Sequence, residues 1–289
     1  MGDLTVLALG GNALVRPGER GTAAEQRANL AETFATLESV VQSERLVVTH
    51  GNGPQVGHEL LRQELASAEA PPLPLYLAVA RTQADIGALI AAELPPVAGR
   101  PVVVLLTRVV VSKDDPAFEQ PTKPVGPFYD EARAAELERE RGWKLREDAS
   151  RGWRRVVPSP RPLAVLELES ARVLLEAGSV VVAAGGGGIP VVQRHGRVDG
   201  VDAVIDKDLA SAVLATSLGA RRLLILTQVP AVYRAFGTAA AVPLEELRAG
   251  RDGAILGELP AGSMRPKVEA AFEFVRTTGG EALITSADA

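Results

Sequence analysis

The fold of this chain is decided by residues 179–190, SVVVAAGGGGIP, together with residues 201–210, VDAVIDKDLA. Periodicity alone does not distinguish the Val-rich run from a short buried helix, but its length and β-branching favour a strand that is covered on both faces. Four glycines at 185–188 follow, and without Cβ atoms their amides can approach a ligand closely. Pro190 ends that freedom. A loop of this kind suits an anion.

A second feature of the same stretch is Asp206-Lys207-Asp208, which places one cation between two carboxylates. A solvated turn is the ordinary explanation for such a triplet. Its position just after an apolar run and close to the glycine loop favours a functional explanation instead.

The composition indicates a soluble globular protein of one large or two ordinary domains, with 289 residues, 46% hydrophobic and 23% charged. The net charge of −5 provides no excess of positive charge with which the protein could bind nucleic acid. No apolar run reaches the roughly 18 residues of a membrane span. Residues 1–9 are too short and too acidic for a signal peptide, so we expect a cytoplasmic protein.

The absence of cysteine excludes disulfides, thiolate catalysis and thiolate-bound metal. No HExxH or comparable ligand pair occurs either, so we expect no metal site held by the protein.

Lysine is rare, since only five of the 31 cationic side chains are lysine. Lys123, Lys207 and Lys267 lie in stretches rich in Gly or Pro, or beside one: PTKPVGPFY, VIDKDLA and GSMRPKVEA. An ammonium is a compact, mobile charge that can follow a phosphoryl group, so this distribution points to phosphate chemistry.

Strand, glycine loop and helix recur along the chain. Residues 4–9 lead into Gly10-Gly11-Asn12, and residues 45–49 lead into HGNGPQVG. With the run at 179–190, three such units predict an α/β fold with a mostly parallel sheet, whose ligand lies beyond the carboxyl ends of the strands. Helix amino termini behind the loops would add N–H groups for an anion.

Two other glycine motifs fit this sequence poorly. Gly51-x-Gly53-x-x-x-Gly57 departs from the dinucleotide spacing GxGxxG, and the acidic residue expected about 20 residues later is missing. The phosphate-loop pattern GxxxxGK[ST] is absent. For His50 we expect a hydrogen-bonded structural role.

Further elements follow from apolar spacing and caps. Helices are predicted at 23–41, begun or punctuated by Asn29 or Thr33, and at 81–94, 130–141 with Asp130 as cap, 209–218, 244–248 and 268–277; strands are predicted at 101–106, 222–227 and 282–285. Residues 112–159 change character and are interpreted as an insertion standing off the sheet. Prolines flank Lys123 there, so it is either a cation held in a fixed direction over the cleft or an exposed linker lysine.

Taken together, these motifs resemble the carbamate kinases, a branch of the amino-acid kinase family. The resemblance covers nearly the whole chain through ALGGNAL, VTHGNGPQVG, TQADIG, PTKPVGPFY, WRRVVPSPRP, AAGGGGIPVV, GVDAVIDKDLAS, LLILTQV with VY, AGSM with PKVEAA, and ITS. It implies a three-layer αβα sandwich with an open, mostly parallel central sheet. It also implies that residues 1–215 bind the acceptor, with a protruding subdomain at about 112–159, that residues 216–289 bind ATP or ADP, and that the protein is a homodimer.

The resemblance also implies roles for individual residues. Amides of Gly10, Gly11, Asn12, Gly51, Asn52 and Gly53 would face the transferring phosphoryl group and its acceptor, and Gly186 and Gly187 would line the acceptor pocket. Lys207 would neutralise the phosphoryl group, Asp208 would hold the surrounding lysines and amides, Lys123 would reach in from the subdomain, and Lys267 would meet nucleotide phosphate. Tyr233, Met264 and Pro266 would lie near the nucleoside.

The implied reaction is reversible phosphoryl transfer between ATP and carbamate, in which carbamate needs no general base and Mg²⁺ is carried by the nucleotide phosphates. In the family the reaction serves arginine or purine breakdown. This chain departs from the family's usual residues at Ala84, Ala88, Gln228, Pro230 and Arg265. A kinase for another small acid, such as an N-acetylated amino acid, and a non-catalytic sensor of ADP or carbamoyl phosphate are the alternatives.

Overall fold

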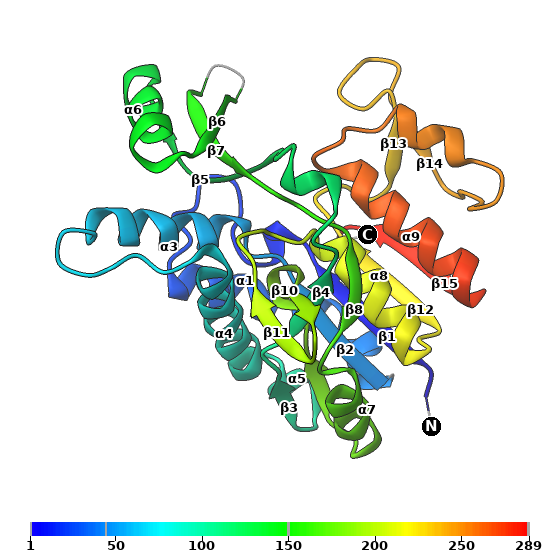
Figure 1. The fold of residues 1–289 in the computed structure, drawn as a ribbon. Helices are drawn as coiled ribbons and strands as arrows, with labels where there is room; N and C mark the ends of the chain where they lie inside the picture. The colour runs from blue at the N-terminus through cyan, green and yellow to red at the C-terminus, as the bar shows by residue number, and fades with distance from the viewer. Residues whose placement is uncertain (1, 44, 149–150, 288–289) are drawn as a thin grey trace.

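The structure is a computed structural model of the 289-residue chain, and it describes residues 2–43, 45–148 and 151–287 (Figure 1). A six-stranded sheet forms its centre, with the strand order β15-β12-β1-β2-β9-β3 and every pair parallel. Its strands are β1 (Leu4–Leu9), β2 (Arg45–His50), β3 (Val102–Val104), β9 (Val180–Val182), β12 (Arg222–Leu226) and β15 (Glu281–Thr285). The predicted mostly parallel sheet is confirmed.

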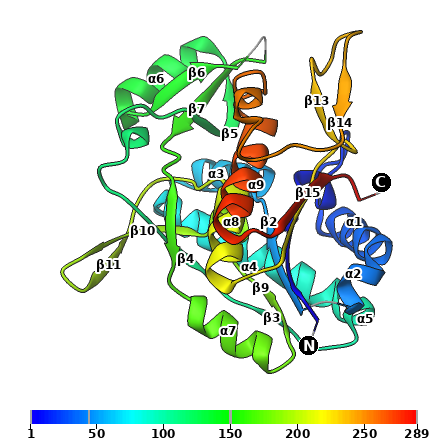
Figure 2. The ribbon, with the colours of Figure 1, turned by 90° about the vertical axis from the view of Figure 1, so that its right-hand side faces the viewer.

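Helices cover both faces of this sheet, and the inner strands β1 and β9 are accordingly buried at every position rather than at alternate ones. On β1, Val6 and Ala8 belong to one core cluster and Leu7 and Leu9 to the other. The first cluster includes α7 (Leu168–Glu176), α8 (Lys207–Leu218) and α9 (Met264–Thr278), and the second includes α1 (Ala23–Thr36), α2 (Glu38–Ser43), α4 (Leu75–Glu93) and α5 (Pro95–Ala98). Figure 2 shows the three layers of the predicted αβα sandwich.

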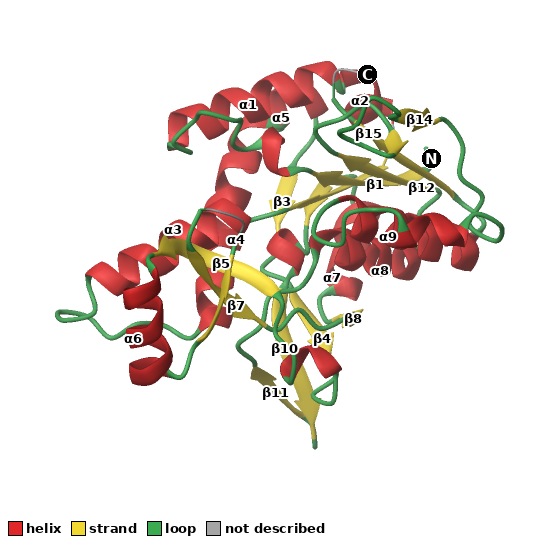
Figure 3. Ribbon diagram, turned by 90° about the horizontal axis from the view of Figure 1, so that it is seen from above, coloured by secondary structure: helices red, strands yellow, loops and turns green. Residues whose placement is uncertain are grey.

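A second sheet begins where the chain leaves β3. It contains β4 (Arg108–Val111), β8 (Pro162–Val165), β10 (Ile189–Arg194) and β11 (Arg197–Gly200), in the order β11-β10-β4-β8. Thr107 links the two sheets, since its carbonyl accepts from Ile189 N at 2.8 Å and its hydroxyl accepts from Ala184 N at 3.0 Å. Figure 3 shows this sheet beside the central one.

The predicted insertion forms a small lobe that stands off the main body (Figure 1). Its elements are the 3₁₀ turn at Pro116–Phe118, β5 (Lys123–Tyr129), α6 (Glu131–Arg141), β6 (Lys144–Glu147) and β7 (Trp153–Val157). The predicted cap is confirmed, because the Asp130 carboxylate accepts from Arg133 N at 2.8 Å. The lobe packs on α3 (Gly53–Leu65), where Tyr129 donates its hydroxyl hydrogen to Glu64 at 2.7 Å.

Two of the predicted helices differ from the structure. The helix expected at 23–41 is broken at Leu37, which leaves α1 and α2 as separate helices. Thr22 begins α1 through a capping box with Glu25, so the expected role of Asn29 or Thr33 as a start is wrong. Both of those polar residues are buried, and Asn29 donates to Leu14 O at 3.2 Å.

The helix expected at 244–248 is also wrong. Leu244 ends β14 (Val242–Leu244), which pairs with β13 (Val232–Arg234) in an antiparallel hairpin. Val232 and Leu244 pack with Phe272 of α9, and this tertiary packing outweighs the local helical spacing.

Smaller differences concern element ends. The helix expected from 81 starts at Leu75, directly after Pro74, and the strand expected at 101–106 is shortened to half-buried β3 at the sheet edge. The strands expected at 4–9, 45–49, 222–227 and 282–285 are confirmed to within a residue or two, as are the ends of the helices expected at 130–141 and 268–277, apart from the earlier start of α9. Within the described part of the chain, no helix combines the length and the apolar character that crossing a membrane requires.

Candidate active site

The glycine loop after β9 is shaped for close approach. Gly186, Gly187 and Gly188 have φ of +63°, +88° and +87°, in the left-handed region that favours glycine. A Cβ on Gly186 would overlap the side-chain amide of Asn52, and one on Gly187 would overlap the carbonyl of Ile205. Both glycines are therefore required by the backbone conformation and by their neighbours.

A buried polar network supports this loop from behind. Gln83 donates to Gly185 O at 2.9 Å and accepts from Thr107 N at 2.5 Å. Asn52 donates to the hydroxyl of Thr82 at 2.9 Å. These contacts fix the loop against α4, so the loop is rigid where a ligand would meet it.

His50, at the end of β2, is completely buried beside the same loop, where a Cβ on Gly185 would overlap its Nε2. Its Nδ1 lies 3.0 Å from Gly51 O. Burial lowers the pKa of His50 to about 4, with a smaller lowering by the charge of Lys207 and an opposing effect of the Gly51 hydrogen bond. The imidazole is thus neutral at physiological pH, in agreement with the structural role expected for it.

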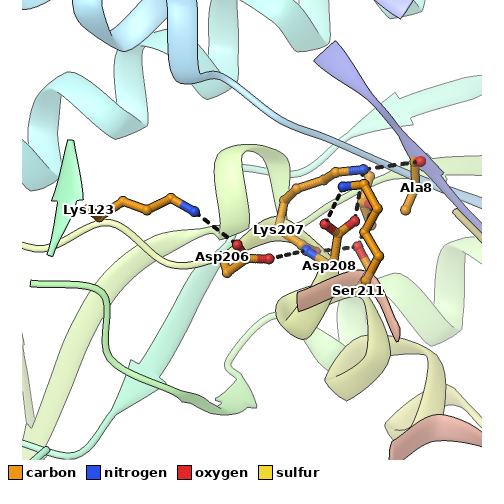
Figure 4. A network of polar contacts seen from close by, with 8 residues as sticks. Ala8, Lys123, Asp206, Lys207, Asp208 and Ser211 are labelled. Atoms are coloured by element: carbon orange, nitrogen blue, oxygen red, sulfur yellow. Dashed lines mark hydrogen bonds and ion pairs between the residues drawn. The ribbon is translucent and has the colours of Figure 1, made fainter. Parts of the chain in front are cut away.

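Two of the predicted lysines converge on the carboxylate of Asp208. Figure 4 shows Lys207 beside that carboxylate. Lys207 Nζ lies 3.0 Å from Asp208 Oδ1 and donates to Ala8 O at 3.2 Å, at the end of β1. Lys267 Nζ, from α9, donates to Asp208 Oδ2 at 2.8 Å. Residues 60 positions apart in the sequence therefore meet at the carboxyl end of the central sheet.

The first turn of α8 holds this cluster in place. Ser211 donates its hydroxyl hydrogen to Lys207 O at 2.6 Å and lies 2.6 Å from the hydroxyl of Thr49 on β2. Both hydroxyl side chains are buried. The helix start is thereby tied directly to the neighbouring strand.

For Lys207 and for Asp208 alike, burial and the oppositely charged neighbours shift the pKa in opposite directions. Burial lowers the pKa of Lys207, although Asp208 opposes the shift. Burial by itself raises the pKa of Asp208, but the two ammonium groups outweigh it and the net pKa lies below the ordinary range. The cluster thus keeps an ionised carboxylate between two cations, and the excess positive charge attracts anions.

Lys123 comes from the lobe and faces the same helix start. Its Nζ donates to Asp206 Oδ2 at 3.0 Å, while Asp206 Oδ1 accepts from Asp208 N at 3.0 Å and caps α8. Of the two placements open from the sequence, the structure thus gives Lys123 a defined position on the cleft rather than that of a free linker lysine. Asp206 was not among the predicted site residues, although its position before a helix is a recognisable cap signal.

Lys123, Asp206 and Lys207 line a cavity of about 680 Å³, whereas Asp208 and Lys267 are not among its lining residues. Six predicted site residues line it, namely Gly51, Asn52, Gly53, Lys123, Gly186 and Lys207. His58, Phe128 and Arg154 also line it and were not predicted, because nothing in their local sequence distinguishes them from surface residues. Gly53 is the first residue of α3, so a helix amino terminus faces the cavity.

A smaller cavity of about 120 Å³ lies at the start of α9, the helix that carries Lys267, where Ser263 and Met264 line it. Tyr233 and Met264, which were predicted to lie near the nucleoside, line it. Phe236 was not predicted and lines it too, with its ring centroid 5.7 Å from that of Tyr233. Pro266 lies in the first turn of α9, directly before Lys267. An aromatic pair of this kind suits a planar base.

The loop after β1 completes the set of predicted glycines. A Cβ on Gly10 would overlap the carbonyl of Leu226, and Gly11 begins a 3₁₀ turn at Gly11–Ala13 with open space beside it. The backbone of Asn12 lies in that turn, and its side chain is outside the described structure.

Comparison with known proteins gives the family. Residues 3–286 match the family described as "Amino acid kinase family". The chain belongs to it. A carbamate kinase of Pyrococcus horikoshii is 43% identical over 98% of this chain and 94% of its own, and one of Halobacterium salinarum is 45% identical over 97% and 92%.

Solved structures agree with this assignment. Carbamate kinase from Giardia lamblia bound to AMP-PNP has a TM-score of 0.91 and 39% identity, covering 99% of this chain and 94% of that one. N-acetylglutamate synthase from Neisseria gonorrhoeae, with 16% identity and a TM-score of 0.56, shares the fold alone. The chain is thus an amino-acid kinase family member that is similar to carbamate kinases over nearly its whole length.

The five residues that we expect from the sequence to depart from the carbamate kinase pattern lie in two parts of the structure. Ala84 and Ala88 are exposed on α4. Gln228 lines the smaller cavity, Pro230 O accepts from the hydroxyl of Thr285 at 3.1 Å, and Arg265 donates to Leu259 O at 3.2 Å. None of these contacts involves Lys123, Lys207, Asp208 or Lys267.

Proposed function

We propose that this protein is a carbamate kinase, which transfers a phosphoryl group reversibly between ATP and carbamate. The observation that carries the proposal is the meeting of Lys123, Lys207 and Lys267 around two aspartates at one end of the parallel sheet. Phosphoryl transfer asks the protein mainly for positioning and for compensation of charge on the phosphoryl oxygens. Mobile ammonium groups and fixed amides supply both.

In this proposal Lys207 neutralises the transferring phosphoryl group, and Asp208 holds Lys207 and Lys267 apart at fixed positions. Lys123 reaches the group from the lobe, and Lys267 meets the nucleotide phosphates. The loop amides around Gly10, Gly11, Asn12, Gly51, Asn52, Gly53, Gly186 and Gly187 cradle the phosphoryl group and its acceptor.

The nucleoside is proposed to occupy the smaller cavity, against Tyr233 and Met264, with Pro266 close by. The division into an acceptor part at 1–215, with its subdomain at about 112–159, and a nucleotide part at 216–289 belongs to the same proposal. Because α8 spans residue 215, the two parts share a helix whose first turn carries the phosphoryl site. The AMP-PNP bound by the Giardia relative supports nucleotide use.

Carbamate is a nucleophile at neutral pH, so the reaction requires no general base. We propose that Mg²⁺ is held by the nucleotide phosphates. Both oxygens of Asp208 already face ammonium groups, and within residues 2–43, 45–148 and 151–287 no three His, Asp or Glu side chains form a possible metal site. This donor set leaves the ion to phosphate oxygens and water.

A coupled assay of ATP formation from carbamoyl phosphate, ADP and Mg²⁺ tests the proposal. The expected result is ATP and carbamate in equal amounts, with turnover that requires all three components. Absence of turnover with folded protein would overturn it.

The size of the larger cavity favours testing a second acceptor class. Its volume of about 680 Å³ exceeds what carbamate alone fills, so an N-acetylated amino acid is the alternative substrate. A screen of acceptors with ATP distinguishes the two. Calorimetry that finds tight binding of ADP or carbamoyl phosphate without turnover would instead indicate a sensor.

The resemblance to carbamate kinases also leads us to propose a cytoplasmic homodimer that acts in arginine metabolism. Light scattering coupled to size-exclusion chromatography tests the homodimer, with a mass of twice 30.3 kDa expected.

A further inference from the structure

Asp206 has two separate tasks at the cleft. Its Oδ1 accepts from Asp208 N at 3.0 Å and caps α8, while its Oδ2 receives the ammonium of Lys123 at 3.0 Å (Figure 4). The cap fixes the carboxylate, because a backbone N–H on a buried helix start cannot follow a moving side chain. Asp206 is therefore a rigid acceptor for a flexible cation.

Lys123 is the cation that most needs such an acceptor. Its side chain is 35% exposed, against 12% for Lys207 and 14% for Lys267, both of which share Asp208. It comes from the lobe rather than from the main body, and its four-carbon stem has many rotamers. Without a partner across the cleft, the ammonium would spend most of its time in solvent.

We propose that Asp206 is a positioning residue for Lys123. It holds the Lys123 ammonium at the cavity that Gly51, Gly53 and Gly186 line while that cavity is empty, and it yields the ammonium to the phosphoryl group when substrate binds. This inference rests on the proposed phosphoryl transfer. No covalent bond changes in this step, since one ion pair replaces another.

The charge balance of the cluster explains why the exchange is possible. Three ammonium groups face two carboxylates, so the empty cleft carries an excess positive charge. A phosphoryl group with two negative charges competes well with one carboxylate that is partly open to water. Asp206 stays in place through its cap, and Lys123 has only to change partners.

The variant Asp206→Asn separates the two tasks. Asparagine can still cap α8 through its carbonyl oxygen, but its amide presents N–H groups to Lys123. We expect kcat to fall about tenfold, because a loosely placed ammonium compensates charge less well in the transition state. The KM for carbamoyl phosphate should not rise, since a negative charge beside the phosphoryl site has been removed.

Asp206→Glu changes the other task. It keeps the carboxylate and caps the helix poorly, so the melting temperature should fall while kcat falls less than in Asp206→Asn. If Asp206 had only a structural role, kcat would fall more in Asp206→Glu than in Asp206→Asn, and this result would overturn the inference. Asp130→Asn is the matched control, because Asp130 caps exposed α6 without contacting Lys123, and it should keep wild-type kcat.

A double-mutant cycle tests the link to Lys123 directly. If Asp206 acts through that lysine, adding Asp206→Asn to Lys123→Met should change kcat by less than about twofold. A tenfold loss in both backgrounds would overturn the inference, as would an unchanged kcat in Asp206→Asn alone.

A readout without turnover separates this inference from the proposed function. In the ligand-free protein, acetic anhydride should acylate Lys123 about threefold faster in Asp206→Asn than in wild type, measured by mass spectrometry against exposed Lys113. An inactive wild type refutes the kinase proposal, and the acylation ratio still decides whether Asp206 holds Lys123. Equal rates in the two proteins would overturn that part.

Discussion

At the scale of single residues, the site depends on ionisable groups that share partners. Lys207 and Lys267 bind opposite oxygens of Asp208, so removal of either lysine leaves the buried carboxylate with one cation. Removal of Asp208 instead would leave two ammonium groups side by side without compensation. The lysines can therefore be tested one at a time without placing an unpaired charge in the core.

Lys207→Met is the first such test. Methionine keeps the aliphatic stem that packs near Gly51, and Asp208 keeps Lys267 as partner. We expect kcat for ATP formation to fall about 100-fold or more, with a melting temperature close to wild type, because the lost ammonium acts on the transferring group. The coupled assay and thermal unfolding measure the two quantities, and a kcat within tenfold of wild type would contradict the assigned role.

His50 predicts how stability responds to acid. Its pKa is lowered to about 4 in the folded protein from 6.5, so the unfolded state binds the extra proton and stability is lost as pH falls between these values. Between pH 7 and pH 5 this group should remove about 2 kcal/mol from the free energy of unfolding.

His50→Gln lacks the titration and serves as the comparison. Urea unfolding of both proteins at pH 7 and pH 5 should show that the variant loses less stability over this interval. An equal loss in both proteins would assign the acid sensitivity to carboxylates instead.

At the scale of elements, three apolar strands that each end in a glycine loop were enough to predict the parallel sheet. The third unit differs from the prediction, because the loop after β9 leads into strand β10 rather than into a helix. An apolar run that is followed directly by turn residues is a local sequence signal for a buried strand. β1, β2 and β9 all have this signal. The break at Leu37 and the β13–β14 hairpin were not predicted. Both depend on what packs against the segment, and spacing along the chain does not contain that information.

The candidate site shows the same division. The lysines and glycines were identifiable because their residue types are unusual in their surroundings and because the motifs resemble a family. The two contacts of Asp206 were not identifiable from the sequence, because one of them is made to Lys123, which lies in the lobe 83 positions earlier in the chain. Phe128, Phe236 and Arg154 reach their cavities only through tertiary structure.

The glycine loop gives the prediction that belongs to elements. Gly187→Ala places a Cβ against the carbonyl of Ile205 and forces φ of +88° on a side chain that disfavours it. Gly178→Ala is the matched control, because Gly178 has φ of +84° with nothing within 4 Å of the added atom.

Backbone strain alone should cost Gly178→Ala about 1–2 kcal/mol of unfolding free energy. Gly187→Ala should cost more and should also raise the KM for carbamoyl phosphate, because the loop must shift away from Ile205. Equal destabilisation in both variants, with KM unchanged in Gly187→Ala, would show that the loop position does not matter for the substrate. Urea unfolding and the coupled assay supply the two measurements.

At the scale of the whole molecule, the lobe and α9 reach the cleft from two sides and are held by different contacts. Glu64 on α3 receives the hydroxyl of Tyr129 at 2.7 Å and Arg133 at 3.2 Å, which holds the lobe that carries Lys123. Burial first, and then the bond to Glu64, raise the pKa of Tyr129, so its hydroxyl stays protonated as the donor. Arg161, before β8, binds Glu269 at 2.5 Å and also Glu273, both on the helix that carries Lys267.

These two sets of contacts predict a crossed result. Glu64→Ala loosens the lobe and should raise the KM for carbamoyl phosphate about threefold, with little change in the KM for ADP. Arg161→Gln loosens α9 and should raise the KM for ADP about threefold, with little change in the KM for carbamoyl phosphate. The factors are modest because the ion pairs are partly exposed and contribute about 1 kcal/mol or less. Steady-state kinetics with each substrate varied in turn measures both. If each variant raised both KM values alike, the lobe and α9 would move as one body. The proposed assignment of Lys123 to the phosphoryl group and of Lys267 to the nucleotide phosphates would then be wrong.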